Sequence, residues 1–249
     1  MVNQGFVGFF DILGYQDIID NNDIENASKV VSDILETLPT KTASGVVSLA
    51  AERSKAAVQL QIDVIQARLI SDSILLAMPV STTSPDIEKM RGVAVFLFYA
   101  AKLMRLAFDN GLPLRGAIDF GDFFLSSQCF AGKPIIDCYR LASRLQLVGC
   151  AITHKCAAHI RELAKKTNRP EVATNLMFPC LAILKGGTTE KYIMLDWYFP
   201  YADWDPIEQD VRSSIIKSFH AHNKDISPEA MQKIDNTEII IRKSLIPRE

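Results

Sequence analysis

The first part of the chain carries an apolar run with a single carboxylate inside it. Residues 6–13 are mostly Val, Phe, Ile and Leu, which is typical of a buried strand, and Asp11 interrupts them near the end. Gly14 then permits a close turn of the backbone, and the residues from Tyr15 onward predict the first turn of a helix. Helical spacing of apolar residues continues up to Pro39, where we expect it to stop.

The next two strands are predicted on either side of a short polar turn. Residues 58–70 alternate apolar side chains with Gln and Asp, which predicts a half-buried strand, and residues 74–78 are apolar. The Ser-Asp-Ser sequence at residues 71–73 predicts a tight hairpin, so Asp72 is expected at a strand end. A proline and two acidic residues then predict the start of a long helix that ends near Gly111.

Strands and helices are predicted to alternate through the second half of the chain as well. A strand at residues 114–121 is expected to pair with residues 123–125 as a hairpin. The elements expected after it are a helix at 135–147, a short strand from residue 151, a helix at 156–166, a hairpin of 180–184 with 192–197, and one or two helices after residue 205. Residues 39–55 fit either a helix at 46–54 or a loop.

The order of these elements predicts an α+β fold. Strand, helix, strand, hairpin, strand, helix and strand are typical of a ferredoxin-like βαββαβ core. We expect a domain over residues 1–204, with residues 205–249 as a C-terminal helical extension of the same domain. In such a core, Asp11 and Asp72 close adjacent central strands at the same end of the sheet.

The two carboxylates suggest metal-dependent phosphate chemistry. A lone Asp in an apolar run costs several kcal/mol unless its charge is paired. Two carboxylates at neighbouring strand ends can hold two divalent ions against a triphosphate, which is the geometry for in-line attack on phosphorus. A strand that runs into a helix also places backbone N–H groups beside the metals. The alternative for Asp11 is a helix-capping role.

Composition and net charge limit the classes of partner that we expect for this protein. The 48% hydrophobic and 22% charged residues are ordinary for a globular protein, and a formal net charge of −2 argues against a nucleic-acid or anionic-membrane partner. No apolar stretch reaches the roughly 18 residues of a membrane span. The N-terminus lacks a signal sequence, so we expect a cytoplasmic protein. Five cysteines without C-x-x-C spacing argue against a disulfide framework.

Two arginines stand one turn apart on the helix predicted at residues 135–147. Arg140 and Arg144 share one face at this spacing and repel each other unless an anion or carboxylates neutralise them. A solvated pair is the alternative interpretation.

Four segments together resemble the catalytic domain of class III nucleotidyl cyclases. They are Phe-Phe-Asp-Ile-Leu-Gly-Tyr at residues 9–15, Leu-Ile-Ser-Asp-Ser-Ile at 69–74, Leu-Arg-Gly-Ala-Ile-Asp-Phe-Gly at 114–121, and Tyr-Arg-Leu-Ala-Ser-Arg-Leu-Gln-Leu-Val-Gly at 139–149. The resemblance extends over residues 5–195. It implies the cyclase fold and a head-to-tail homodimer with its active sites at the subunit interface, so that a monomer is expected to be inactive.

By position, the resemblance implies a role for each matching residue. Two Mn²⁺ or Mg²⁺ ions would be held by Asp11, Asp72 and the carbonyl of Ile12. The nucleoside triphosphate would lie against the backbone that follows. The residues implied for metal or substrate in this part of the chain are Asp11, Ile12, Leu13, Gly14, Tyr15 and Asp72.

The remaining implied roles concern catalysis and the base. Arg144 matches the arginine that stabilises the transition state in the partner's site, and Arg140 replaces an asparagine that orients the ribose. Arg68 takes the place of the purine-reading lysine, and Lys133 falls near the usual purine-reading aspartate. Purines need an acceptor there, whereas the O2 and O4 acceptors of uracil fit two cationic donors.

The chain is also similar to the pyrimidine cyclases of the bacterial Pycsar anti-phage systems, in which cyclic UMP or cyclic CMP activates a separate effector. The expected reaction is therefore conversion of UTP to 3′,5′-cyclic UMP and diphosphate. A cytidylate, adenylate or guanylate cyclase is one alternative. A catalytically silent cyclase-like dimer that binds a nucleotide is the other, although such a domain has no physical reason to keep two carboxylates at adjacent strand ends.

Overall fold

The computed structural model describes residues 2–126, 129–198 and 210–244. Within them, eight strands form one sheet in the order β2-β3-β1-β4-β6-β8-β7, and β5 pairs with β4 outside this path. The strands are β1 Val2–Ile12, β2 Gln66–Ile70, β3 Ser73–Pro79, β4 Leu114–Leu125, β5 Phe130–Gly132, β6 Gly149–Ile152, β7 Met177–Ile183 and β8 Thr189–Leu195. The α-helices are α1 Tyr15–Asp20, α2 Ile24–Lys29, α3 Leu38–Leu49, α4 Lys55–Asp63, α5 Asp86–Asp109, α6 Lys133–Arg144, α7 His154–Thr167, α8 Pro170–Asn175, α9 Val211–His220 and α10 Pro228–Ser244.

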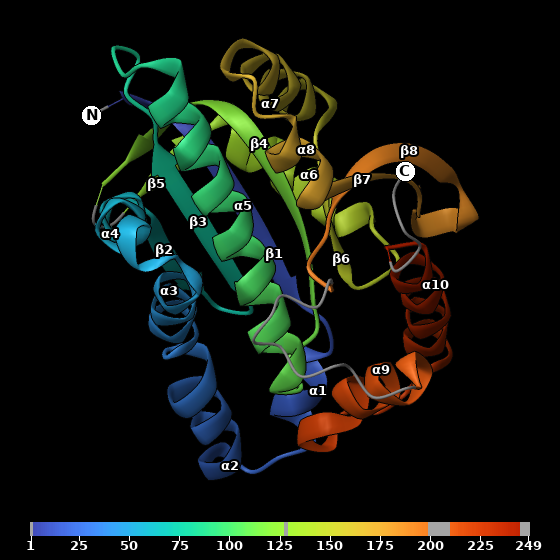
Figure 1. Ribbon diagram of the computed structural model, residues 1–249. Coiled ribbons are helices and arrows are strands. Elements are labelled where there is room, and N and C mark those ends of the chain that lie inside the picture. Colours follow the sequence, from blue (N-terminus) through green and yellow to red (C-terminus); the bar gives the residue numbers. More distant parts are fainter. Residues whose placement is uncertain (1, 127–128, 199–209, 245–249) are drawn as a thin grey trace.

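The strand β1 lies inside the sheet, between β3 and β4 (Figure 1). It pairs antiparallel with β3 on one side and with β4 on the other, and β2 is antiparallel to β3. Helices connect β1 to β2, and α5 connects β3 to β4, so these elements form a βαββαβ unit. Beyond β4, β6 is parallel to it, and β8 and β7 follow as an antiparallel pair. The predicted α+β class is confirmed.

Both faces of β1 are buried, which explains its nearly continuous apolar sequence. Phe6 and Phe10 enter the main core, where Phe6 lies 5.7 Å from the ring of Phe96 on α5. Val7 points to the opposite face and belongs to a second core that α6 covers. Cys138 of α6 donates from its Sγ to the Val7 carbonyl at 3.5 Å. Figure 1 shows α5 crossing the near face of the sheet.

The strand predicted at residues 58–70 is wrong over its first part, because α4 occupies Lys55–Asp63 and only β2 is extended. Ile62 is buried in the core and Val58, four residues earlier, packs against it, whereas Leu60 is 68% exposed. Spacing of four residues is that of one helix face. Over so short a segment, the pattern of apolar and polar residues fits both the two-residue period of a strand and the period of about 3.6 residues of a helix. Here the helical period is correct.

Pro39 begins a helix instead of ending one. It stands in the first turn of α3, where its missing N–H group costs no hydrogen bond. The helix expected before it is divided into α1, α2 and a π-helical segment, Val30–Leu35. Residues 39–55 were expected to form either a helix or a loop. They are mostly helical, with α3 followed by the 3₁₀ turn Glu52–Ser54.

The strand β4 is longer than expected. Residues 123–125 do not fold back onto residues 114–121 but continue the same strand and pair with β5. The other elements expected in this half are confirmed, including the β7–β8 hairpin and two helices near the C-terminus.

The two C-terminal helices share the main core with the sheet. Ile215 and Phe219 of α9 and Ile234 and Ile241 of α10 are buried in the same cluster as Phe10.

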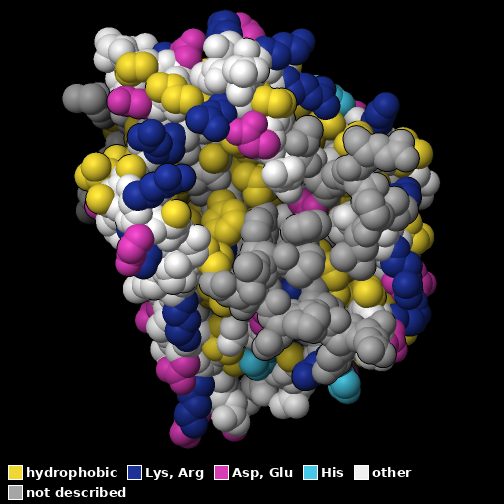
Figure 2. Space-filling view, viewed as in Figure 1, with side chains coloured by type: hydrophobic (Ala, Val, Ile, Leu, Met, Phe, Trp, Pro, Cys, Tyr) yellow, Lys and Arg dark blue, Asp and Glu magenta, His cyan; other side chains and the backbone are white. Residues whose placement is uncertain are grey.

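In the part of the chain that the structure describes, none of the helices combines the length and the apolar sequence that a membrane span requires. On the face shown in Figure 2, acidic and basic side chains are interspersed and do not gather in one basic patch.

Candidate active site

A cavity of about 340 Å³ opens where the C-terminal end of β1 meets the β2–β3 turn. Its walls come from β1 and α1, from the β2–β3 turn, from β4, and from the segment that leads from α9 into α10. The lining residues are Asp11, Ile12, Leu13, Gly14, Tyr15, Gln16, Asp17, Asp72, Arg115, Phe219, Lys224, Asp225, Ser227, Glu229, Ala230 and Lys233.

The sheet register brings the two predicted carboxylates to this cavity. Asp11 pairs with Ser73 across β1 and β3, which places it beside Asp72 in the turn. The turn is the tight hairpin expected from the sequence, with Ser71 at a left-handed φ of 53°. The N–H of Ile12 donates to the Asp72 carbonyl at 2.9 Å and ties the two segments together.

Asp11 is held by an ion pair across the central strands. Arg115 is its pairing partner on β4, and the Arg115 Nε donates to Asp11 Oδ2 at 2.6 Å. The two side chains are only 15% and 18% exposed. Burial raises the pKa of Asp11, Arg115 opposes that shift, and the negative charge of Asp72 raises the pKa further.

The carboxylates at this end of the sheet fit a divalent cation that also binds phosphate. Since the charge of Asp72 raises the pKa of Asp11, a cation between them would relieve their repulsion. No three His, Cys, Asp or Glu side chains cluster for a metal in the described part of the chain. An ion held by Asp11, Asp72 and the Ile12 carbonyl would therefore take its other ligands from water and substrate, as Mg²⁺ does at many phosphate sites.

The backbone after β1 lines the cavity because of Gly14. Its φ of 76° is in the left-handed region, and an added Cβ would lie 2.8 Å from Cδ of Lys224. Leu13 is fixed just before it by an N–H···O bond of 2.9 Å to Pro113. Tyr15 opens α1, where the helix was predicted to begin, although α1 is only six residues long. Leu13, Gly14 and Tyr15 all lie at the cavity.

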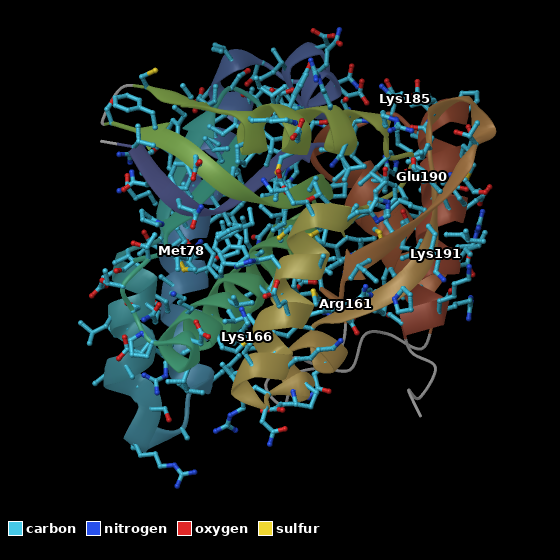
Figure 3. All side chains as sticks on the ribbon, turned by 90° about the horizontal axis from the view of Figure 1, so that it is seen from above. Met78, Arg161, Lys166, Lys185, Glu190 and Lys191 are labelled. Atoms are coloured by element: carbon cyan, nitrogen blue, oxygen red, sulfur yellow. The ribbon has the colours of Figure 1, made fainter. Side chains whose placement is uncertain are left out.

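The predicted catalytic arginines lie outside this cavity in their own chain. Both are exposed on α6. Arg144 forms an ion pair of 3.3 Å with Glu190 of β8, and His154 approaches the other oxygen of Glu190 at 3.8 Å. Figure 3 shows Glu190 on the β7–β8 hairpin, near Lys185. Neither Arg140 nor Arg144 lines the cavity.

The two residues predicted to read the base do not line the cavity, and Lys133 is also remote from Asp11 within one chain. Arg68 pairs with Leu75 across β2 and β3, and its Nε is buried without a hydrogen-bond partner among the described residues. Lys133 opens α6 next to β5, whose Gly132 pairs with Phe123. That position is eight residues along β4 from Arg115, or roughly 26 Å at about 3.3 Å per residue.

Sequence analysis missed several side chains of the cavity. The sequence pattern places Arg115 only within a strand, although a charged residue inside an apolar strand indicates an oppositely charged partner, here Asp11. Lys224, Glu229 and Lys233 lie more than 200 residues from Asp11 in sequence, and no local pattern connects them. Lys224 is almost fully buried, its Nζ donates to the carbonyls of Gly111 and Ser218, and burial lowers its pKa to about 8.

Comparison with known proteins gives limited similarity. The sequence matches no protein-family model, and no curated protein is significantly similar to it. Among solved structures, a bacterial light-regulated adenylyl cyclase matches 81% of this chain and 94% of its own, with a TM-score of 0.41 and 11% identity. A class III adenylyl cyclase-like ATP-binding protein from Pseudomonas aeruginosa matches 70% of this chain and 40% of its own, with a TM-score of 0.41 and 16% identity.

The Asp11–Arg115 pair can be tested through stability and pH. Replacing Arg115 by Met leaves a buried carboxylate unpaired and should cost about 2 kcal/mol or more of unfolding free energy at pH 7. Without Arg115 the folded-state pKa of Asp11 rises further, so the folded state binds a proton more readily than the unfolded state. The stability deficit should therefore be smaller at pH 4 than at pH 7.

Chemical denaturation of wild type, Arg115→Met and Arg161→Met at both pH values measures this. Arg161 is an exposed arginine on α7 and serves as the matched control. A deficit of the same size at pH 4 and pH 7 would show that Arg115 stabilises the protein by packing and not through the Asp11 charge.

Proposed function

We propose that this protein is a nucleotidyl cyclase of the class III type that converts UTP to 3′,5′-cyclic UMP and diphosphate. The observation that carries the proposal is the shared cavity of Asp11 and Asp72, at the end of two adjacent central strands of a βαββαβ sheet. Of the four cyclase-like sequence segments, two supply the carboxylates and a third supplies Arg115 to the same cavity.

The chain's own residues would act as follows. Asp11, Asp72 and the Ile12 carbonyl would hold two Mn²⁺ or Mg²⁺ ions, which when bound would supply activation of the 3′-hydroxyl and neutralisation of the phosphates. The ribose 3′-oxygen forms a bond to the α-phosphorus, the bond to the bridging oxygen of the β-phosphate breaks, diphosphate leaves, and the hydroxyl proton passes to solvent.

The remaining parts of the cavity orient the reactants. Arg115 holds Asp11 in place through its 2.6 Å bond. The turn at Gly14 keeps backbone between Leu13 and Tyr15 at the cavity wall, where the phosphates would lie.

We further propose that the active protein is a head-to-tail homodimer. Arg144 lies outside the cavity of its own chain, so it can stabilise the transition state only in a second subunit's site. Lys133 is likewise too far from Asp11 to read a base held there by the same chain, and Arg68 does not line the cavity. A composite site made from two chains resolves all three placements.

For the base, Arg68 and Lys133 supply donors that suit the carbonyl oxygens of uracil. One observation favours a second candidate, cytidylate cyclase: Lys133 forms an ion pair with Asp137 one turn along α6. That carboxylate is an acceptor which the N4 amino group of cytosine could use. The cyclic nucleotide would act as a second messenger for a separate effector in anti-phage defence.

The reaction itself is tested by incubating the purified protein with Mn²⁺ and each of UTP, CTP, ATP and GTP. We expect cyclic UMP as the main product by mass spectrometry, and loss of at least 99% of it in the Asp72→Asn variant. Asp72 is half-buried in a turn, so its isosteric replacement should leave the fold intact. The exposed Asp122→Asn variant is the control. No cyclic product from any nucleotide, or a tenth of wild-type activity in Asp72→Asn, would contradict the two-metal cyclase.

The composite site is tested by complementation. Asp72→Ala and Arg144→Ala proteins should each be inactive, because every site in either homodimer lacks one essential group. Mixing them should restore about one quarter of wild-type activity, since half the dimers are mixed and each has one intact site. If the subunits exchange, as mass spectrometry of the mixture can show, and activity does not return, Arg144 acts within its own chain or not at all.

Base selection is tested with Arg68→Ala. A charge-assisted hydrogen bond contributes about 1.5–3 kcal/mol, so losing it should reduce the preference for UTP over CTP by roughly tenfold to a hundredfold. The ratio of kcat/KM values for the two nucleotides is the measurement, and Arg91→Ala on the exposed side of α5 is the control. An unchanged ratio would leave the cyclase activity in place and remove Arg68 from base recognition.

A further inference from the structure

The segment Asp210–Ser244, which contains α9 and α10, supplies a large part of the cavity lining. Its lining residues are Phe219, Lys224, Asp225, Ser227, Glu229, Ala230 and Lys233. We call these residues the C-terminal wall. The four segments that resemble nucleotidyl cyclases end before it begins, so that resemblance assigns it no role.

The turn between α9 and α10 is anchored by polar contacts to residues at the ends of α1 and α5. The side chain of Asn22 donates to the His222 carbonyl at 2.9 Å, and that of Asn21 to the Asn223 carbonyl at 2.8 Å. The His222 ring lies 2.7 Å from the carbonyl of Asn110. Because these bonds join the turn to α1 and to the end of α5, the C-terminal wall has a defined position against both.

The helix α10 is fixed separately, by hydrogen bonds to the loop that follows α6. The N–H of Val148 donates to Thr237 Oγ1 at 2.8 Å, and Asn236 Nδ2 donates to the Gln146 carbonyl at 2.7 Å. Thr237 and Asn236 are both buried. Lys233 stands one turn before them on the same face, so these contacts orient it toward the cavity.

Lys233 is the cation of this wall that remains available to a ligand. Its side chain is only 14% exposed, and its Nζ lies 2.8 Å from Glu229, whose side chain is 60% exposed. Lys224, by contrast, is committed to two backbone carbonyls. An exposed carboxylate can exchange its partner at low cost, whereas a nearly buried ammonium that faces a cavity needs an anion close by.

We infer that Lys233 binds the phosphate tail of the nucleotide from within the same chain, and that Glu229 is its partner only while the site is empty. This inference rests on the proposed function and identifies a triphosphate contact in the C-terminal wall. On binding, the Lys233 ammonium exchanges the Glu229 carboxylate for phosphate oxygens, while Arg115 remains on Asp11. The affinity for a triphosphate therefore depends on Lys233, and the affinity for a monophosphate does not.

The test compares binding of 3′-deoxy-UTP, which lacks the attacking hydroxyl, with binding of UMP, by calorimetry in the presence of Mg²⁺. Lys233→Met should weaken 3′-deoxy-UTP binding at least tenfold and change UMP binding less than twofold. Lys233→Arg keeps the charge and should bind 3′-deoxy-UTP within about threefold of wild type. Lys243→Met, an exposed lysine at the end of α10, is the matched control.

Glu229→Gln tests the same contact in the opposite direction. It removes the competing carboxylate at an exposed position, where folding is not at risk, and should tighten 3′-deoxy-UTP binding severalfold. Unchanged or weaker binding in this variant, or wild-type binding by a folded Lys233→Met protein, overturns the inference and leaves the cyclase proposal in place. A wild-type protein that binds neither nucleotide overturns both.

Discussion

Asp11 and Arg115 face each other across the two central strands, and much of the structure depends on this ion pair. The strand β1 is covered on both faces, so an unpaired carboxylate near its end would be costly. The pair also fixes the register of β1 against β4. A slip of one residue would turn Arg115 to the opposite face and leave both charges buried without partners. The same bond therefore specifies the sheet and presents Asp11 to the cavity.

The parts of this arrangement that depend on neighbouring residues could be predicted from the sequence. The apolar run around Asp11 and the polar turn at Asp72 are local patterns, and both appear where they were expected. Their meeting at one cavity follows from the strand order. Because β1 and β3 are adjacent and antiparallel, the C-terminal end of β1 lies beside the start of β3 and the turn before it. Predicting the contact of Arg115 with Asp11 requires one further inference, namely that a charge within an apolar strand is paired with an opposite charge on the neighbouring strand.

The rest required information that no short segment contains. The stretch around Leu60 satisfies the periods of a strand and a helix, and packing of Val58 and Ile62 against the core decides between them. The position of α10 depends on buried hydrogen bonds to a loop about ninety residues earlier in the chain. Such contacts reflect tertiary packing, so neither Lys233 nor Glu229 had a signal in sequence that linked it to Asp11.

The anchoring of the α9–α10 turn has a consequence for the time at which the cavity forms. Asn21 and Asn223 are 202 residues apart, and closing so long a loop is slow compared with forming the hairpins of the sheet. During synthesis the sheet and both carboxylates can assemble while the last wall is still on the ribosome. Each chain would then complete its cavity only after its own sheet has folded.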